Sequence, residues 1–192
     1  MENDIKLNDI IDDNLKRKFY EICYKFKALN YFSYINTSFL NIETKELNFL
    51  HIDLNKYLDF YRNERFILID PVMDLIFYTN RDIICFEELN YKELVNENGK
   101  IYNPGKIINA HKASNKYCML NGFYTVLRLK SKYMITGSYG IHSKNFKIEK
   151  FFDNKYAEGK WFSEYTKQIN FLLLNAINKK EFEENNFNKI IH

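Results

Sequence analysis

Apolar residues recur every three or four positions near the start of the chain, with charged residues between them. This stripe consists of Leu15, Phe19, Ile22, Cys23, Phe26 and Leu29. The spacing places the apolar side chains on one face and predicts an amphipathic helix. Asp12, Asp13 and Asn14 precede the stripe and are candidates for the N-cap, because their side chains can accept hydrogen bonds from the free N–H groups of the first turn.

Two pairs of segments have strand patterns instead. Residues 31–38 and 46–52 alternate between apolar and polar side chains, and the polar sequence NIETK between them favours a hairpin. Residues 123–129 and 133–141 are a second predicted pair of strands, joined by the sequence KSK. The short apolar run at residues 82–86 adds a fifth strand.

Three further segments have the spacing of helices, namely residues 55–64, 107–118 and 159–178. The step from Asp70 to Pro71 ends any helix before it, because a residue that precedes proline disfavours the α region. The last helix has the longest apolar stripe: Trp161, Phe162, Tyr165, Ile169, Leu172, Leu173, Ala176 and Ile177. The sequence KKEFEENNFNKIIH that follows is predicted to be frayed or weakly helical.

The order of these elements is helix, hairpin, helix, strand, helix, hairpin, helix. Helices with one apolar face each, placed on both sides of a sheet, satisfy this order. We therefore predict the α/β (α+β) class, as a three-layer α/β/α sandwich around a mainly antiparallel five-stranded sheet. The chain is expected to form one domain at residues 1–180, followed by a short tail at 181–192.

Length and composition are those of a folded chain with a core of its own. The 192 residues are 46% hydrophobic and 17% aromatic, which excludes a disordered protein. The formal net charge is +3 and the basic residues are scattered, so no basic stripe for binding nucleic acid is present. Neither a signal peptide nor a run of membrane-spanning length is visible, and we expect a cytoplasmic protein that does not contact a membrane.

The residues that usually perform catalysis or bind metals do not cluster in this sequence. Cys23, Cys85 and Cys118 are odd in number and widely spaced, which favours free thiols in a reducing compartment over a disulfide or a zinc site. Cys118 and His111 are the nearest approach to a catalytic pair, seven residues apart on a predicted helix, but core packing explains Cys118 better. We expect no enzymatic activity, no cofactor and no metal site.

One acid, Asp70, ends the apolar run at residues 66–69 and directly precedes a proline. Aspartate is costly to bury without a partner. One interpretation makes Asp70 a turn residue or a helix cap, with Tyr57 and Tyr61 as core aromatics, because Asp and Pro are common in turns. The other makes Asp70 a hydrogen-bond acceptor in a pocket walled by aromatic rings, the usual makeup of a small-molecule site.

The pattern Tyr57-x3-Tyr61-x8-Asp70-Pro71-Val72 resembles the signature of the autoinducer-binding domain of LuxR-type quorum-sensing regulators. In that family an aromatic residue, usually Trp, is followed four residues later by Tyr and then, at this same distance, by Asp-Pro. The resemblance extends over roughly residues 15–178.

Three later stretches support the resemblance. The sequence FEEL at residues 86–89 resembles the family's second Trp followed by an acid, and GFYTV at 122–126 lies where the family has Gly-x-x-x-Pro. The sequence YMITGSYG at 133–140 matches the family's last strand, where a Ser or Thr often faces the ligand. Ser138 is the candidate for that residue.

The resemblance implies a buried acyl-homoserine lactone or a related small apolar signal. Asp70 would accept the amide N–H of the ligand, Tyr57 would donate to the lactone carbonyl, and Ser138 would be the second polar contact. Tyr61 and Phe86 would be walls of the pocket. The implied ligand-binding residues are Tyr57, Tyr61, Asp70, Val72, Phe86 and Ser138.

The sequence departs from the family pattern at four positions, two of them among these six. Tyr57 and Phe86 replace tryptophans, Asp53 stands where a ligand-binding Tyr is common, and Val126 replaces the proline. We therefore expect a changed pocket, in which Asp70 is the polar feature to retain.

Two functions follow from the resemblance. The first is a stand-alone signal-binding domain, because the residues after the last predicted helix are too few and too acidic for the family's helix-turn-helix domain, and direct DNA binding is not expected. The alternative is an interaction protein that dimerises with itself or with a full-length LuxR-type regulator, and whose pocket is changed or vestigial. Exposed apolar side chains on the last helix, around Phe171 to Leu174, would favour this alternative.

Overall fold

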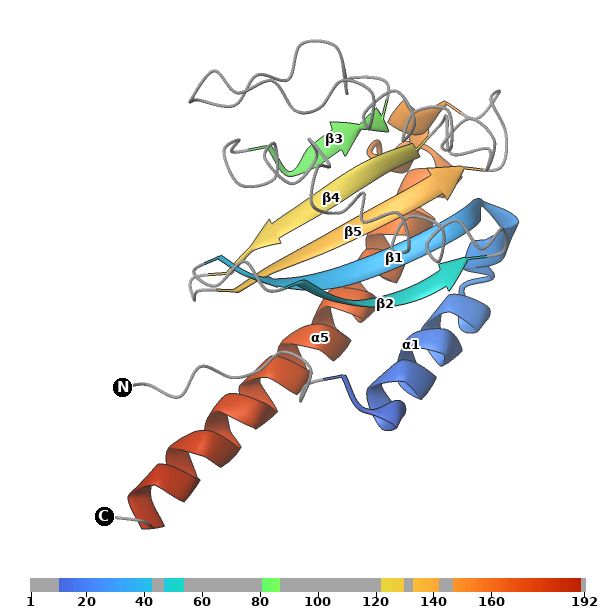
Figure 1. Ribbon diagram of the computed structural model, residues 1–192. Coiled ribbons are helices and arrows are strands. Elements are labelled where there is room, and N and C mark those ends of the chain that lie inside the picture. The colour runs from blue at the N-terminus through green and yellow to red at the C-terminus, as the bar shows by residue number, and fades with distance from the viewer. Residues whose placement is uncertain are drawn as a thin grey trace, which may run out of the picture.

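Five strands form a single antiparallel sheet in which the strand order is β2-β1-β5-β4-β3 (Figure 1). The computed structural model describes residues 11–42, 47–53, 81–86, 122–129, 133–141 and 147–190. The strands are β1 (Phe32–Asn41), β2 (Leu47–Asp53), β3 (Ile83–Cys85), β4 (Gly122–Arg128) and β5 (Tyr133–Ile141). The two predicted hairpins are both confirmed, because β1 pairs with β2 and β4 pairs with β5.

Two helices, α1 (Asp13–Lys25) and α5 (Ala157–Ile190), lie side by side against one face of this sheet (Figure 1). Asp12 is the N-cap of α1, as predicted, and its Oδ1 accepts a hydrogen bond from the Leu15 N–H at 2.6 Å. Short 3-10 turns at Ala28–Asn30 (η2) and Ile148–Phe151 (η5) lead into β1 and towards α5.

The last helix is longer than the sequence pattern predicted. We expected it to end near residue 178, but α5 continues to Ile190. The extra segment contains neither proline nor glycine and is rich in Lys and Glu, which favour helix, so intrinsic propensity extends the helix beyond the apolar stripe. The prediction of a frayed tail underestimated this effect.

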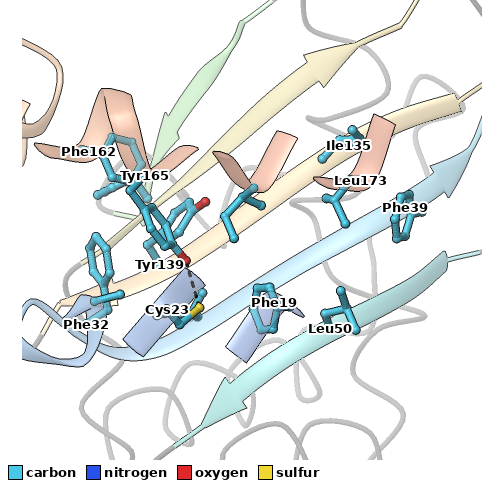
Figure 2. Packing of buried hydrophobic residues seen from close by; sticks show 14 of the residues in the cluster. Phe19, Cys23, Phe32, Phe39, Leu50, Ile135, Tyr139, Phe162, Tyr165 and Leu173 are labelled. Atoms are coloured by element: carbon cyan, nitrogen blue, oxygen red, sulfur yellow. Dashed lines mark hydrogen bonds between the residues drawn. The ribbon is translucent and has the colours of Figure 1, made fainter. Parts of the chain in front are cut away.

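Aromatic side chains fill the core between the sheet and the helices (Figure 2). Phe123, Tyr139 and Phe162 pack together, and the ring centroids of each pair among them are 5.2 Å apart. The Phe32 ring centroid lies 5.1 Å from that of Tyr139. Such tilted and edge-on pairs add to the free energy gained by burying the rings. These contacts fix α5 on the sheet.

Trp161 fastens the start of α5 to the end of α1. Its indole stacks on the Tyr165 ring at 5.4 Å, and its Nε1–H donates to the backbone oxygen of Phe26 at 2.9 Å. A buried tryptophan needs such a partner for its N–H. The side chain therefore serves as the core anchor expected from the sequence.

The predicted α/β class and the five-stranded antiparallel sheet are confirmed. The helical layer predicted for the other face of the sheet, from residues 55–64 and 107–118, lies outside the described residues. No helix in the described part of the chain is both long enough and apolar enough to cross a membrane.

Candidate functional site

The two faces of the sheet differ in chemistry because side chains alternate along each strand. Ile35, Phe39, Ile135 and Tyr139 point towards α1 and α5 and belong to the aromatic core. The intervening residues lie on the opposite side, which we call the far face. Its members include Tyr34, Asn36, Ser38 and Leu40 of β1, Phe49 and His51 of β2, Ile84 of β3, Tyr124, Val126 and Arg128 of β4, and Met134, Thr136 and Ser138 of β5.

The far face is buried and partly polar, although none of the described helices lies on it. Ser38, Thr136 and Ser138 are 2%, 7% and 6% exposed, and the apolar Leu40 beside them is completely buried. Hydroxyl groups are costly to remove from water unless they find hydrogen-bond partners. A buried surface of this mixed kind is typical of a small-molecule site.

The strand register aligns one row of side chains across the whole far face. His51 pairs with Asn36, Asn36 with Ser138, Ser138 with Tyr124, and Tyr124 with Ile84. We call these five residues the central row. Side chains of paired residues on neighbouring strands lie close enough to contact one another or one ligand together.

Asn36 occupies a special position in the central row. Its Nδ2 donates to the Ser38 Oγ at 3.2 Å, while its Oδ1 is buried and has no hydrogen-bond partner among the described residues. Every other residue of β1 is fully buried, whereas Asn36 is only partly so. A buried amide atom without a partner loses the hydrogen bond that water would supply.

Phe86 joins the central row from the end of β3. Its ring centroid lies 4.8 Å from that of Tyr124, and the ring also covers Gly122. A Cβ atom at Gly122 would lie 2.5 Å from the Phe86 ring and would also meet the Tyr139 backbone oxygen. Gly122 pairs with Gly140, so the sheet presents no side chain at this point except the covering phenyl ring.

Two of the six predicted site residues, Phe86 and Ser138, therefore lie on the same face and both flank Tyr124. The other four, Tyr57, Tyr61, Asp70 and Val72, lie outside the described residues. The binding roles of all six stay predictions.

Val126 has a structural reason to differ from the family's proline. Its N–H donates to the backbone oxygen of Asp82 at 2.8 Å, which ties β4 to the segment that enters β3. Proline has no N–H and could not form this bond. The side chain of Val126 is buried on the far face.

Sequence reasoning missed the polar residues of β1. Tyr34, Asn36 and Ser38 stand two apart in this strand, and only Asn36 among its residues is not fully buried. The polar composition of the stretch INTS at residues 35–38 is visible in the sequence and could have marked β1 as a candidate part of the site.

The ionisable groups of the aromatic core have raised pKa values. Cys23 and Tyr165 share a hydrogen bond between Sγ and Oη at 3.4 Å (Figure 2), and burial raises the pKa of the Cys23 thiol to about 11. Burial also raises the pKa values of Tyr139 and Tyr165 above their ordinary range. A thiol that stays protonated at neutral pH is a poor nucleophile.

Neither of the two described cysteines, Cys23 and Cys85, is part of a disulfide, and Cys118 and His111 lie outside the described residues. Within those same residues, no group of His, Cys, Asp or Glu side chains is arranged to hold a metal ion.

A groove lies outside the core, between α1 and α5. This groove has a volume of about 960 Å³ and mixes basic, acidic and apolar side chains, among them Lys18, Glu21, Ile22 and Phe171. Phe171 is 67% exposed, whereas Leu173 on the core side of α5 is completely buried.

Comparison with solved structures identifies the fold. The chain is similar to Escherichia coli SdiA in complex with octanoyl-rac-glycerol, with a TM-score of 0.55 and 13% identity over 87% of this chain and 60% of that one. It is also similar to the solution structure of SdiA residues 1–171, with a TM-score of 0.52 and 12% identity over 84% of this chain and 85% of that one.

A third similar structure is that of CepR2 from Burkholderia cenocepacia, described as an N-acylhomoserine-lactone-dependent LuxR-family transcription factor. Its TM-score is 0.49 at 10% identity, over 79% of this chain and 90% of that chain. No protein-family model and no curated protein matches this chain. The chain spans about three-fifths of the SdiA molecule in the octanoyl-rac-glycerol complex.

These likenesses bear on the fold. The fold implied by the resemblance in the sequence is confirmed, since most of this chain superimposes on the two SdiA structures.

Proposed function

We propose that this chain, which has the fold of a LuxR-type autoinducer-binding domain, binds a small signal molecule against the far face of its sheet. The observation that supports this proposal most strongly is the pairing of Asn36 with Ser138 in a polar row, beside the buried hydroxyl groups of Ser38 and Thr136, on a face where no described helix packs. A purely structural interface would be expected to bury apolar side chains there.

The signal is proposed to be an acyl-homoserine lactone or a related acylated molecule. Ser138 would contact the amide carbonyl of the ligand, and Phe86 would pack against the ligand beside Tyr124. Asp70 would accept the amide N–H, and Tyr57, Tyr61 and Val72 would complete the site. The SdiA structure with octanoyl-rac-glycerol suggests that acylated ligands without a lactone belong in the same panel.

The test is a thermal-unfolding series with acyl-homoserine lactones of different chain lengths and with octanoyl-rac-glycerol. A ligand at about 100 times its Kd stabilises the folded state by about 2.7 kcal/mol, which corresponds to a rise in Tm of roughly 5 to 10 °C for a chain of this size. Absence of any shift across the panel would refute the proposal.

Substitutions at the site sharpen this test. Ser138→Ala should weaken binding by about five- to tenfold, because one hydrogen bond contributes about 1 to 1.5 kcal/mol. Asp70→Asn should weaken amide-bearing ligands more, since a neutral acceptor replaces a charged one. Ser163→Ala, the same substitution as at Ser138 but at an exposed position on α5, is the matched control and should leave affinity unchanged.

A second candidate function is assembly with another chain of the same fold, through α5. The exposure of Phe171 supports it, because Phe171 lies next to the half-buried Leu172 and Leu174, and apolar side chains gathered on a surface are typical of interaction sites. Light scattering should then report a dimer that Phe171→Glu dissociates. Tyr24→Glu is the control, because Tyr24 is equally exposed, at 69%, but lies outside the residues that line the groove.

A further inference from the structure

The central row contains more hydrogen-bonding capacity than one amide needs. His51, Asn36, Ser138 and Tyr124 follow one another across four adjacent strands, and only the fifth member, Ile84, is apolar. An unsubstituted acyl chain can use none of these groups. A ligand that lay across this row with apolar carbons alone would leave the buried Asn36 Oδ1 without a partner, which costs free energy.

Asn36 is the member of the central row with a hydrogen-bond acceptor that lacks a donor in the described part of the chain. Ser38 holds the Nδ2 end of its amide at 3.2 Å, so the side chain is oriented before any ligand arrives. The Oδ1 end is buried and has no partner among the described residues. A preoriented acceptor of this kind favours ligands that present an O–H or N–H at that point and penalises those that do not.

The register fixes where on the ligand that group must be. Asn36 and Ser138 are Cα partners on neighbouring strands, which lie about 4.8 Å apart. If Ser138 contacts the amide carbonyl, as proposed above, Asn36 reaches a neighbouring part of the acyl chain. An oxygen on the third acyl carbon falls within one such strand spacing of the carbonyl oxygen.

We propose that Asn36 is a specificity-determining residue that hydrogen-bonds an oxygen substituent near the start of the acyl chain, so that the site prefers 3-hydroxyacyl ligands over unsubstituted ones. This inference rests on the proposed signal-binding function. A 3-oxo ligand is served by the same amide turned end for end, with the Ser38 hydroxyl donating to Oδ1 and the amide N–H facing the ligand. The hydroxyl form fits the orientation in this structure.

The experiment measures Kd by titration calorimetry for three acyl-homoserine lactones of equal chain length, namely 3-hydroxy, 3-oxo and unsubstituted. In the wild-type protein we expect the 3-hydroxy ligand to bind about tenfold more tightly than the unsubstituted one, which corresponds to one hydrogen bond. In Asn36→Leu, which keeps the branched shape of the side chain but has no polar atom, the two ligands should bind with about equal affinity.

Two further variants protect the test against misfolding. Asn36→Ala makes the same deletion with a smaller side chain, in case leucine does not fit in β1. Thr136→Val alters another hydroxyl of the far face, which pairs with Ser38 rather than with Asn36, and should change the affinity for all three ligands by the same factor. A loss of preference confined to the two Asn36 variants supports the inference.

The other outcomes are distinct. Equal binding of the 3-hydroxy and unsubstituted ligands by the wild type would overturn this inference and leave the proposed function intact. A preference that survives in both Asn36 variants would overturn the assignment to Asn36. If no lactone binds, the proposed function fails and this inference fails with it.

Discussion

Gly122 shows how the absence of one side chain shapes the candidate site at the scale of a residue. A Cβ atom there would lie 2.5 Å from the Phe86 ring and would meet the Tyr139 backbone oxygen. Real Cβ atoms do not approach other groups so closely, so the phenyl ring covers this part of the far face only because residue 122 is glycine. The position of Phe86 beside Tyr124 follows from that.

Gly122→Ala should therefore destabilise the fold by about 1 to 3 kcal/mol, the usual cost of adding a methyl group to a filled interior. Urea denaturation measures this change. The cost should be smaller in a Phe86→Ala background, because the ring that opposes the new methyl group is then absent. Strictly additive effects of the two substitutions would contradict the close packing of Phe86 on Gly122.

At the scale of the element, the N-cap residue Asp12 sets the position at which α1 begins. The Asp12 carboxylate accepts a hydrogen bond from the Leu15 N–H, one of the first-turn donors that lack a partner within the helix. The neighbouring Asp13 is 99% exposed at its side chain and forms an ion pair with Lys16 at 3.1 Å. The two acids are adjacent in sequence, but only the first has a structural task.

Asp12→Ala should lower the free energy of unfolding by about 1 kcal/mol, as is typical for loss of an N-cap. Asp13→Ala is the matched control and should change it by less than about 0.5 kcal/mol, since exposed ion pairs contribute little. Chemical denaturation of both variants makes the comparison. Equal effects would show that the charge of this turn matters and the capping geometry does not.

At the scale of the whole molecule, the aromatic core makes the protein sensitive to alkaline pH. Burial raises the pKa of Cys23 from 9.0 to about 11 and raises those of Tyr139 and Tyr165. The folded state therefore keeps protons that the unfolded chain releases once the pH exceeds 9. Folding stability is fully present below that pH and is lost as the pH rises towards the folded pKa values.

We predict that the free energy of unfolding is constant near neutral pH and falls above pH 9, by up to about 1.4 kcal/mol per pH unit for each group that titrates only in the unfolded chain. Cys23→Ser keeps a partner for the Tyr165 hydroxyl but removes the thiol, so the decline should begin about one pH unit higher. Urea denaturation between pH 7 and 11 tests this. If stability began to fall at the same pH in the wild type and in Cys23→Ser, the thiol of Cys23 would not be the group responsible.

The sequence by itself determined the five strands and the two helices of the described residues, and with them the fold class. The stripe from Leu15 to Leu29 specifies α1, and the alternation in residues 31–38 and 133–141 specifies the two central strands, because these periodicities are set locally by backbone geometry. The sequence also pointed to Phe86 and Ser138 through the family resemblance. It underestimated the length of α5, where helix propensity rather than burial continues the helix to Ile190.

Only the tertiary structure decided which side chains meet. The pairing of Asn36 with Ser138 depends on the register between β1 and β5, which are separated by about a hundred residues in the chain. A shift of one residue would turn either side chain to the opposite face. Register results from the packing of both faces of the sheet at once. No local pattern could therefore have placed the unpartnered Asn36 oxygen beside Ser138. That placement supports the proposed ligand specificity.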